Sequence, residues 1–155
     1  MNREDREITN IEEIEKIINN AKVIRVAVCE NNRPYIIPLN FGYKEKCIYI
    51  HSSKKGMKID ILKKNNNVSF EVDGDHELVL SDKACGFSMK YTSVVGFGKA
   101  YLISDSKQKK QTLDIIMAHY SNGIFDYSQE QLEKICIIRI DIESMTGKKS
   151  AVGHN

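Results

Sequence analysis

The chain reveals its architecture in two neighbouring stretches, Pro34-Tyr-Ile-Ile-Pro-Leu-Asn-Phe-Gly-Tyr43 and Cys47-Ile-Tyr-Ile-His-Ser-Ser-Lys-Lys-Gly-Met-Lys-Ile-Asp60. The runs 34–43 and 47–52 are rich in Ile and Tyr, so they predict two β-strands joined at the polar turn Lys44-Glu45-Lys46. The second strand leads through Ser, Lys and Gly into a helical segment. Helix starts of that composition bind anions through their free backbone N–H groups.

Pro38 lies inside the first of these strands. A proline cannot donate a hydrogen bond to a neighbouring strand, so it is confined to a sheet edge, a bulge or a gap in the pairing. We therefore expect a break in the sheet at Pro38, which a ligand could occupy.

The remaining sequence predicts further elements on both sides of these stretches. Upstream, a capping box at Thr9–Glu12 begins a helix over 10–20, and a strand over 22–30 forms a meander with the next two strands. Downstream we expect a helix over 57–64, then strands over 68–72 and 76–80 joined by an Asp73-Gly74 hairpin, and a long, bent strand over 89–103. A helix over 106–120 follows, with Leu113, Ile116, Met117 and Tyr120 buried. The chain should end in a short helix capped by Ser128, a strand over 135–142 and a polar tail over 147–155.

The order of these elements predicts an α+β fold that is mainly β. Six or seven mostly antiparallel strands with inserted helices suggest a barrel, because the connections are hairpin-sized and lack repeated βαβ crossovers. Gly96 and Gly98 inside the long strand indicate a bulge or a barrel corner. A length of 155 residues with 41% hydrophobic residues fits a single domain over 1–155.

Charge and composition exclude several classes of protein. The 23 basic and 21 acidic residues give a net charge of +2, and the lysine pairs 54–55, 63–64, 109–110 and 148–149 are dispersed, as on a solvated surface. Nucleic acid is therefore not an expected partner. The start of the chain has no apolar core of a signal peptide, and no apolar run reaches membrane-spanning length, so we expect a cytoplasmic protein with no membrane partner.

Cysteine and histidine positions argue against a metal site. The four cysteines, at 29, 47, 85 and 136, include no Cys-x-x-Cys, and the four histidines show no ligand spacing, so we expect reduced structural thiols and no metal.

Known nucleotide and hydrolase motifs are also incomplete. Gly96-Phe-Gly98 lacks the third glycine of a dinucleotide fingerprint and lies inside a strand. Gly147-Lys-Lys-Ser150 lacks the first glycine of a P-loop, since Ile142 stands there. No Gly-x-Ser-x-Gly elbow is present.

Three blocks of sequence together resemble a known family. Pro34–Tyr43, His51 to Asp60 and Met89-Lys-Tyr-Thr-Ser-Val-Val-Gly-Phe-Gly-Lys-Ala100 are similar to the FMN-binding split barrel of the pyridoxamine 5′-phosphate oxidase-related flavoproteins, specifically the nitroimidazole-resistance (Nim) type. The resemblance covers nearly the whole chain. It implies a homodimer with one FMN in each of two clefts at the subunit interface.

The resemblance also implies which residues contact FMN. Backbone groups of β-strand residues would meet the polar edge of the isoalloxazine ring, residues around the following helix start would surround the phosphate, and one serine would reach the cofactor from the long strand. The contacts with the ring would come from Ile37, Pro38, Leu39 and Asn40, and Ile50, His51, Ser52 and Ser53 would follow on the next strand. The residues around the phosphate would be Gly56, Met57 and Lys58, and the serine of the long strand is Ser93. Met57 stands where the oxidase has arginine and Ser93 where it has glutamine, and Ser52, Ser53, Lys54 or Lys55 is expected to compensate.

Residue chemistry supports parts of this assignment and leaves others open. A phosphate dianion needs a fixed cation and several donors, which Lys58, two serines and a helix start supply. Without the resemblance, Lys58 would be read as a surface lysine. His51 fits equally a hydrogen-bonded wall residue and a flavin contact that donates a proton. Asn40 is expected to be a cofactor contact, because a buried amide in an apolar strand needs partners.

The resulting functional hypothesis is an FMN-dependent oxidoreductase that passes electrons from NADH or NADPH to a small planar acceptor such as a nitroaromatic. The alternative is a non-catalytic protein that stores or senses a flavin, or haem, on the same fold. Oxidation of pyridoxamine phosphate is not expected, because the 147–155 end lacks the arginine-bearing segment that the oxidase uses on its substrate.

Overall fold

The computed structural model describes residues 6–150, and within them it contains eight β-strands, four α-helices and one 3-10 turn. The strands are β1 (Glu7–Ile8), β2 (Ile24–Glu30), β3 (Arg33–Leu39), β4 (Gly42–Lys44), β5 (Cys47–Ser53), β6 (Asn67–Val79), β7 (Ser88–Ile103) and β8 (Ile135–Lys149). The helices are α1 (Ile11–Asn20), α2 (Met57–Lys64), α3 (Ser106–Ala118) and α4 (Gln129–Lys134), with the 3-10 turn η2 at Ala84–Gly86. No helix in this part of the chain is long and apolar enough to span a membrane.

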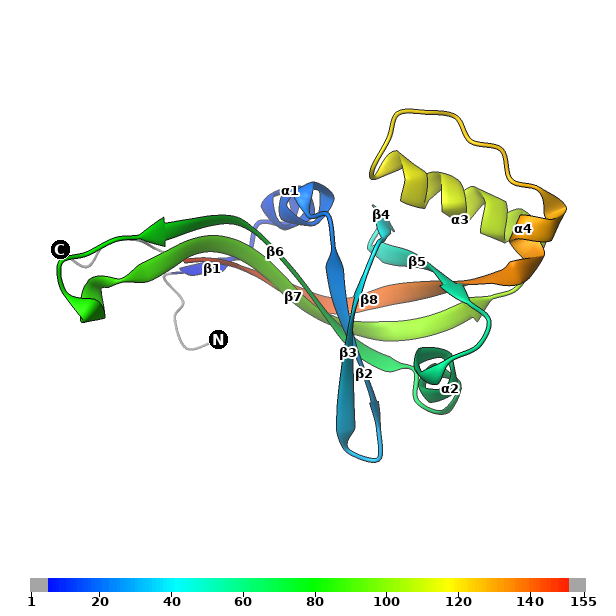
Figure 1. Cartoon of the computed structure of the whole chain (residues 1–155), viewed down its shortest axis with the longest axis horizontal. Helices are drawn as coiled ribbons and strands as arrows, with labels where there is room; N and C mark the ends of the chain where they lie inside the picture. Colours follow the sequence, from blue (N-terminus) through cyan, green and yellow to red (C-terminus); the bar gives the residue numbers. More distant parts are fainter. Residues whose placement is uncertain (1–5, 151–155) are drawn as a thin grey trace.

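All strand pairs are antiparallel and belong to one sheet in the order β3-β2-β6-β7-β8-β5-β4, with β1 paired to β8. The long strands β6, β7 and β8 curve through the whole molecule, and the β2–β3 hairpin crosses them near the middle (Figure 1). The mainly β, α+β fold with a split barrel is therefore confirmed. The strand count differs from the prediction for three reasons: β1 was not expected, the run 34–43 divides into β3 and β4, and the predicted strands 68–72 and 76–80 form the single strand β6.

The two faces of the sheet are covered by different helices. The main core joins Ile14 and Ile18 of α1 and Ile59 and Leu62 of α2 to one face of the strands. Cys136, Ile138 and Ile140 of β8 lie in this core, whereas the alternating Ile137 lies outside it and is also fully buried. Since successive residues of a strand point to opposite faces, α3 and α4 cover the other face of β8, where Ile116 and Leu132 are buried as well.

The meander predicted for the first three long strands is wrong. Asn40 and Phe41 interrupt the run 34–43: β3 pairs with β2 at one end of the sheet, and only the short β4 forms a hairpin with β5. Phe41 is fully buried, and its N–H donates to the Tyr120 hydroxyl at 2.9 Å instead of to a strand. Pro38 does lie on an edge strand, as its chemistry requires.

The Asp73-Gly74 hairpin is also wrong, because β6 continues through this dipeptide to Val79. The register with β7 shifts between Gly74 and Glu77, and Asp75 takes a φ of 56°, so the chain forms a bulge here. The chain reverses only at η2. Strands β6 and β7 thus form a longer ribbon than the sequence pattern indicated.

Smaller differences concern the ends of elements. Asn10, and not Thr9, caps α1, since its side chain accepts hydrogen bonds from the N–H groups of Glu12 and Glu13. The predicted tail begins later than residue 147, because β8 continues to Lys149 and pairs with β1 and β7. Residues 151–155 of that tail lie outside the described residues.

Gly98 allows β7 to bend tightly against β8, as the glycine pattern predicted. The register between these strands shifts at Phe97/Gly98, and a Cβ added to Gly98 would lie 2.4 Å from the backbone oxygen of Asp141. We expect Gly98→Ala to lower the free energy of unfolding by about 1–3 kcal/mol, the range for inserting a methyl group into packed structure. Chemical denaturation measures this difference.

The matched control for that substitution is Gly74→Ala in the same sheet. A Cβ at Gly74 meets no atom within 4 Å, and its φ is not in the left-handed region. The control should therefore retain the parent stability. Equal stability of both variants would show that β7 and β8 do not approach as closely as described.

Candidate functional site

The end of β5 and the start of α2 form a turn that is suited to an anion. Gly56 precedes the helix with a φ of 124°, a conformation that favours glycine. Its carbonyl accepts the first helical hydrogen bond from Asp60 N–H at 3.1 Å, and no side chain caps the first turn. The first backbone N–H groups of α2 are therefore available to a bound ligand.

Lys58 lies in that first turn and is half-buried. Burial lowers the pKa of its ammonium group, and the nearby Cys136 thiol opposes this change. Within residues 6–150 Lys58 has no ion pair or hydrogen bond. A partly desolvated ammonium without an acidic partner is destabilised, and a bound anion would remove that cost.

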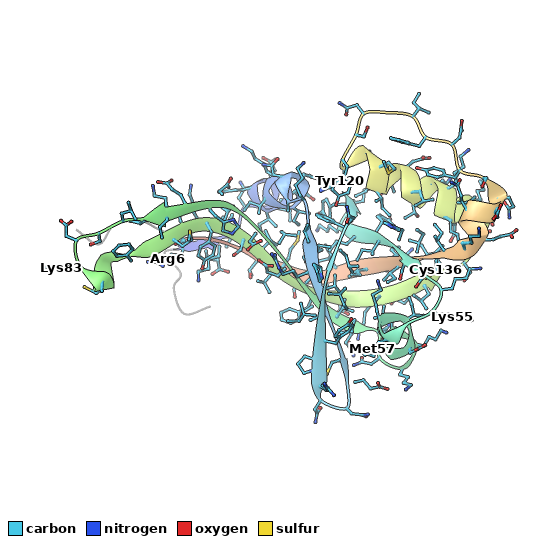
Figure 2. All side chains as sticks on the ribbon, viewed as in Figure 1. Arg6, Lys55, Met57, Lys83, Tyr120 and Cys136 are labelled. Carbon is cyan, nitrogen blue, oxygen red and sulfur yellow. The ribbon has the colours of Figure 1, made fainter. Side chains whose placement is uncertain are left out.

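Two more lysines, Lys54 and Lys109, contribute positive charge near Cys136. Burial raises the pKa of the Cys136 thiol, and the positive charges of Lys109, Lys58 and Lys54 oppose this change. We call Lys54, Lys58 and Lys109 the lysine cluster. None of them forms an ion pair within the described part of the chain. Figure 2 places Cys136, Lys55 and Met57 on the α2 side of the molecule.

Lys109 corrects the prediction that the 109–110 pair is solvated surface. It is 2% exposed, and its ammonium donates to the Leu132 carbonyl at 2.8 Å, which ties α3 to α4. Lys109, Thr112 and Ile116 form the buried stripe of α3, whereas Leu113 and Met117 are only half-buried. Positions 109, 112 and 116 have the spacing of one buried helix face, but the pattern did not predict burial there because residue 109 is a lysine.

Serine hydroxyls lie beside the lysine cluster. Ser52 is buried at 6% exposure, and its hydroxyl has no hydrogen-bond partner in the described structure. The Ser53 hydroxyl donates to the Lys55 carbonyl at 2.6 Å, which shapes the turn before Gly56. Ile50 is buried in the core, and Met57 is exposed. Ser52 is thus a free donor next to the cations.

His51 is exposed on β5, on the face that also carries Cys47 and Tyr49. Its neighbour across the strands is Ile137. No hydrogen bond of its ring is found among residues 6–150, so the histidine does not form the hydrogen-bonded wall that was one of its two expected roles. Its imidazole remains accessible to a ligand or an acceptor.

Strand β3 provides an open sheet edge for the other part of the predicted site. One side of β3 pairs with β2, against which α2 packs, and no strand in the described range lies on its other side. Ile37 and Leu39 pack against the core, while Pro38 is exposed. Asn40 is also exposed, so the argument that a buried amide there needs a partner does not hold.

Ser93 is far from the lysine cluster within one chain. Ser52 lies opposite Cys136 on β8, whereas Ser93 lies opposite Lys148, a separation of 12 residues (136 to 148) along that strand. At about 3.3 Å per residue this is roughly 40 Å of strand. Ser93 is 8% exposed, and its hydroxyl has no hydrogen-bond partner among the described residues. A single copy therefore does not bring it to Lys58.

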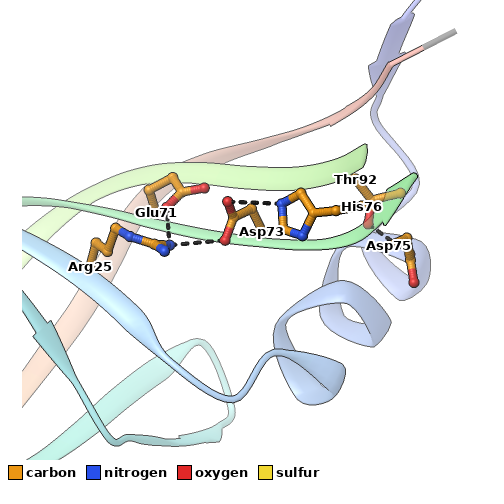
Figure 3. Close-up of polar contacts among 6 residues, drawn as sticks. All are labelled: Arg25, Glu71, Asp73, Asp75, His76 and Thr92. Carbon is orange, nitrogen blue, oxygen red and sulfur yellow. Dashed lines mark hydrogen bonds and ion pairs between the residues drawn. The ribbon is translucent and has the colours of Figure 1, made fainter. Parts of the chain in front are cut away.

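A second polar cluster lies around Asp73, which is opposite Ser93 on the neighbouring strand (Figure 3). Arg25 pairs with Glu71 at 3.1 Å and with Asp73 at 2.9 Å, and His76 contacts Asp73 at 3.2 Å. Burial would raise the pKa of Asp73, but Arg25 and then His76 outweigh it, so the pKa is lowered. Because Arg25 is already paired with two carboxylates, this cluster fixes the strands and leaves no free cation for an anion.

Beside this cluster, a cleft of about 490 Å³ lies between α1 and the bulge of β6. Lys16, Asn20, Arg25, Asp73, Thr92 and Lys149 are among its lining residues. Charges of both signs line it, so it favours no single class of ligand. Within residues 6–150 no group of three or more His, Cys, Asp or Glu side chains could hold a metal ion.

Comparison with known proteins identifies the family of this fold. The model of a family described as pyridoxamine 5′-phosphate oxidase matches residues 10–149. A candidate 5-nitroimidazole antibiotic resistance protein from Bacteroides thetaiotaomicron is 35% identical, with a TM-score of 0.84 over 92% of this chain and 86% of that chain. No curated protein gave a significant match.

More distant structures share the fold alone. A FAD and haem binding protein from Mycobacterium smegmatis has a TM-score of 0.87 at 18% identity, covering 97% of this chain and 76% of that one. The flavocytochrome Anf3 from Azotobacter vinelandii has a TM-score of 0.83 at 21% identity, covering 94% and 69%. From the family match over residues 10–149 and the 35% identity, we conclude that the chain belongs to the pyridoxamine 5′-phosphate oxidase family.

Proposed function

We propose that this protein is an FMN-dependent oxidoreductase that takes electrons from NADH or NADPH and passes them to a small planar acceptor such as a nitroaromatic. Lys58 is the observation that carries the proposal. It is a half-buried cation without an ion-pair partner in the described structure, at an uncapped helix start, and burial lowers its pKa. These are the properties of a site built for an anionic group.

The residues present fit the phosphate of FMN. A dianion would receive the charge of Lys58, donors from the first turn of α2 and the free hydroxyl of Ser52, while Lys109 adds a second, buried positive charge. The resistance protein from Bacteroides supports the choice of acceptor through its name, and the flavin-binding relatives support the choice of cofactor class.

The chain's own groups would mainly bind and orient the cofactor. A bound flavin supplies hydride acceptance and electron transfer, so no acid–base pair of the protein is required. The unpaired edge of β3 offers backbone donors and acceptors to a flat polar ring. His51, exposed on β5, would be the side chain that donates a ring proton to a reduced acceptor.

The proposal includes a homodimer, and the position of Ser93 supports it. If Ser93 and Lys58 hold the same cofactor, they must come from different copies, because about 40 Å of strand separates their levels in one chain. In a two-fold dimer each copy would supply Lys58 to one site and Ser93 to the other.

The visible absorption spectrum of the purified protein tests the proposal directly. We expect a bound flavin that loses its absorption when NADH or NADPH is added under anaerobic conditions, and that regains it when a nitroaromatic acceptor is added. A protein that binds no flavin would contradict the proposal.

Two relatives favour a second candidate function, a non-catalytic flavin- or haem-binding protein. One relative is named as binding both FAD and haem, and another is named as a flavocytochrome. In this case the protein would retain a flavin or haem tightly, and neither nicotinamide would reduce it at a useful rate.

A further inference from the structure

Beyond the barrel, β6 and β7 continue as a two-stranded ribbon, which we call the arm (residues 74–92). The last β7–β8 pair joins Thr92 to Lys149, so among the described residues β7 pairs from there outward only with β6. Ser150 adds two hydrogen bonds, to the carbonyls of Tyr91 at 2.8 Å and Met89 at 2.7 Å, and the described chain ends there. Figure 2 shows Lys83 at the tip of the arm, on the opposite side of the molecule from Lys55 and Met57.

One face of the arm is apolar and exposed. Leu78 lies opposite Met89 on this face, and Leu80 and Phe87 come at the next alternating positions, one residue beyond the ends of β6 and β7. The exposed fractions are 56% for Leu78, 73% for Leu80, 51% for Phe87 and 41% for Met89. An isolated two-stranded ribbon is marginally stable in water, and a contiguous apolar face of this kind marks a contact surface.

We propose that the arm packs on a second copy of this chain, with its apolar face against the surface beside the partner's Lys58. The inference rests on the proposed function. It adds that the partner contributes a covering element as well as Ser93, so the arm would exclude water from one border of the cofactor site.

Continuity with the site identifies the second copy as the occupant. Ser93 lies opposite Asp73, directly at the base of the arm. If Ser93 reaches the partner's lysine cluster, the same two strands carry the arm onto the partner beyond that cluster. Exposed apolar side chains also occur on that side of the chain, including Met57 at 61%. The arm and this surface lie at opposite ends of one copy, so they meet only between two copies.

Cys85 allows a direct test, since it is exposed at the tip whereas the other three cysteines are partly or fully buried. A photoreactive maleimide on Cys85 would be activated in flavin-loaded dimers assembled from isotopically light and heavy chains. We expect light–heavy cross-links from Cys85 to peptides around residues 54–58, and none in Cys85→Ser. Cross-links within one chain only, or none in a coloured dimer, would overturn the arm proposal and leave the flavin proposal intact.

A pair of substitutions tests the energetic role of the apolar face. Leu80→Lys combined with Phe87→Lys should weaken the dimer at least tenfold, as measured by light scattering across a dilution series. Ser88→Lys is the matched control, because Ser88 is exposed and points to the opposite face of the ribbon, and it should leave the dimer unchanged.

The remaining outcomes also decide the question. Unchanged dimerisation of the double variant would overturn the proposal. The proposal would also be overturned if the parent protein bound anionic phospholipid vesicles and the double variant lost this binding while it kept its dimer. In that case the arm would contact a membrane surface. Circular dichroism of both variants separates these results from loss of folding. A colourless monomeric protein would contradict the proposed function and the arm together.

Discussion

Lys58→Ala should lower the affinity of the protein for FMN by about 10- to 150-fold. The charge-assisted hydrogen bond between an ammonium and a phosphate is worth about 1.5–3 kcal/mol, which corresponds to that range in the dissociation constant. Fluorescence titration of the flavin-free protein with FMN measures the change. Because Lys58 is half-buried and has no acidic partner in the described structure, the substitution should not destabilise the fold.

Lys63→Ala is the matched control, because Lys63 is an exposed lysine on the same helix. It should retain the parent affinity. Riboflavin provides a second control, since it lacks the phosphate and should bind both proteins with nearly equal affinity. Equal FMN affinity of Lys58→Ala and the parent protein would show that Lys58 is an ordinary surface lysine.

The pH dependence of FMN binding gives an independent measure of the same contact. Phosphate binds the ammonium form of Lys58, so affinity should fall as pH rises through the pKa of Lys58 in the free protein. Burial lowers this pKa, and the fall should therefore begin below the pH at which an exposed lysine titrates. Lys58→Arg should remove the fall, because arginine stays protonated throughout this range.

Much of the architecture could be predicted from the sequence because local signals agree with the tertiary structure there. Helix α2 has the predicted bounds, and the long β7 differs from its prediction by one residue. The two glycines of β7 gave the bend because only a residue without Cβ fits against Asp141 at Gly98. The family resemblance named the split barrel from three blocks of sequence, and the comparisons confirm it.

The errors arose where long-range pairing overrides local pattern. Asp73-Gly74 is a strong turn signal, yet β6 continues through it because β7 pairs with both sides of the bulge. The run 34–43 looks like one strand, but burial of Phe41 and its bond to Tyr120, 79 residues away, divide it. The burial of Lys109 depends likewise on the Leu132 carbonyl of another helix. None of these partners can be read from the local sequence.

The separation of Ser93 from Lys58 is the feature of the site that sequence alone could not give. The resemblance named both residues as cofactor contacts, and the strand register places them at distant levels of β8. The two statements agree only if each site draws on two chains. This leads to a test that does not depend on the chemistry of the acceptor.

Mixing Lys58→Ala chains with Ser93→Ala chains should restore flavin binding that neither variant shows alone. In a two-fold dimer each homodimer has two impaired sites, whereas a heterodimer has one intact site and one site that lacks both residues. At an FMN concentration that leaves both homodimers empty, full exchange of equal amounts should fill about a quarter of all sites, since half of the dimers are mixed. Flavin absorbance of the desalted mixture measures this recovery.

A chain that carries both substitutions is the decisive control for this experiment. Mixed with the parent chain, it forms heterodimers whose two sites each lack one residue, so no intact site arises outside parent homodimers. If each site draws on two chains, exchange should therefore raise the filled fraction from none to about a quarter of all sites in the first mixture, and lower it from about half to about a quarter in the second. If Lys58 and Ser93 served one site within a single copy, mixing the two single variants would restore nothing, and half of the sites in the double-variant mixture would bind flavin normally.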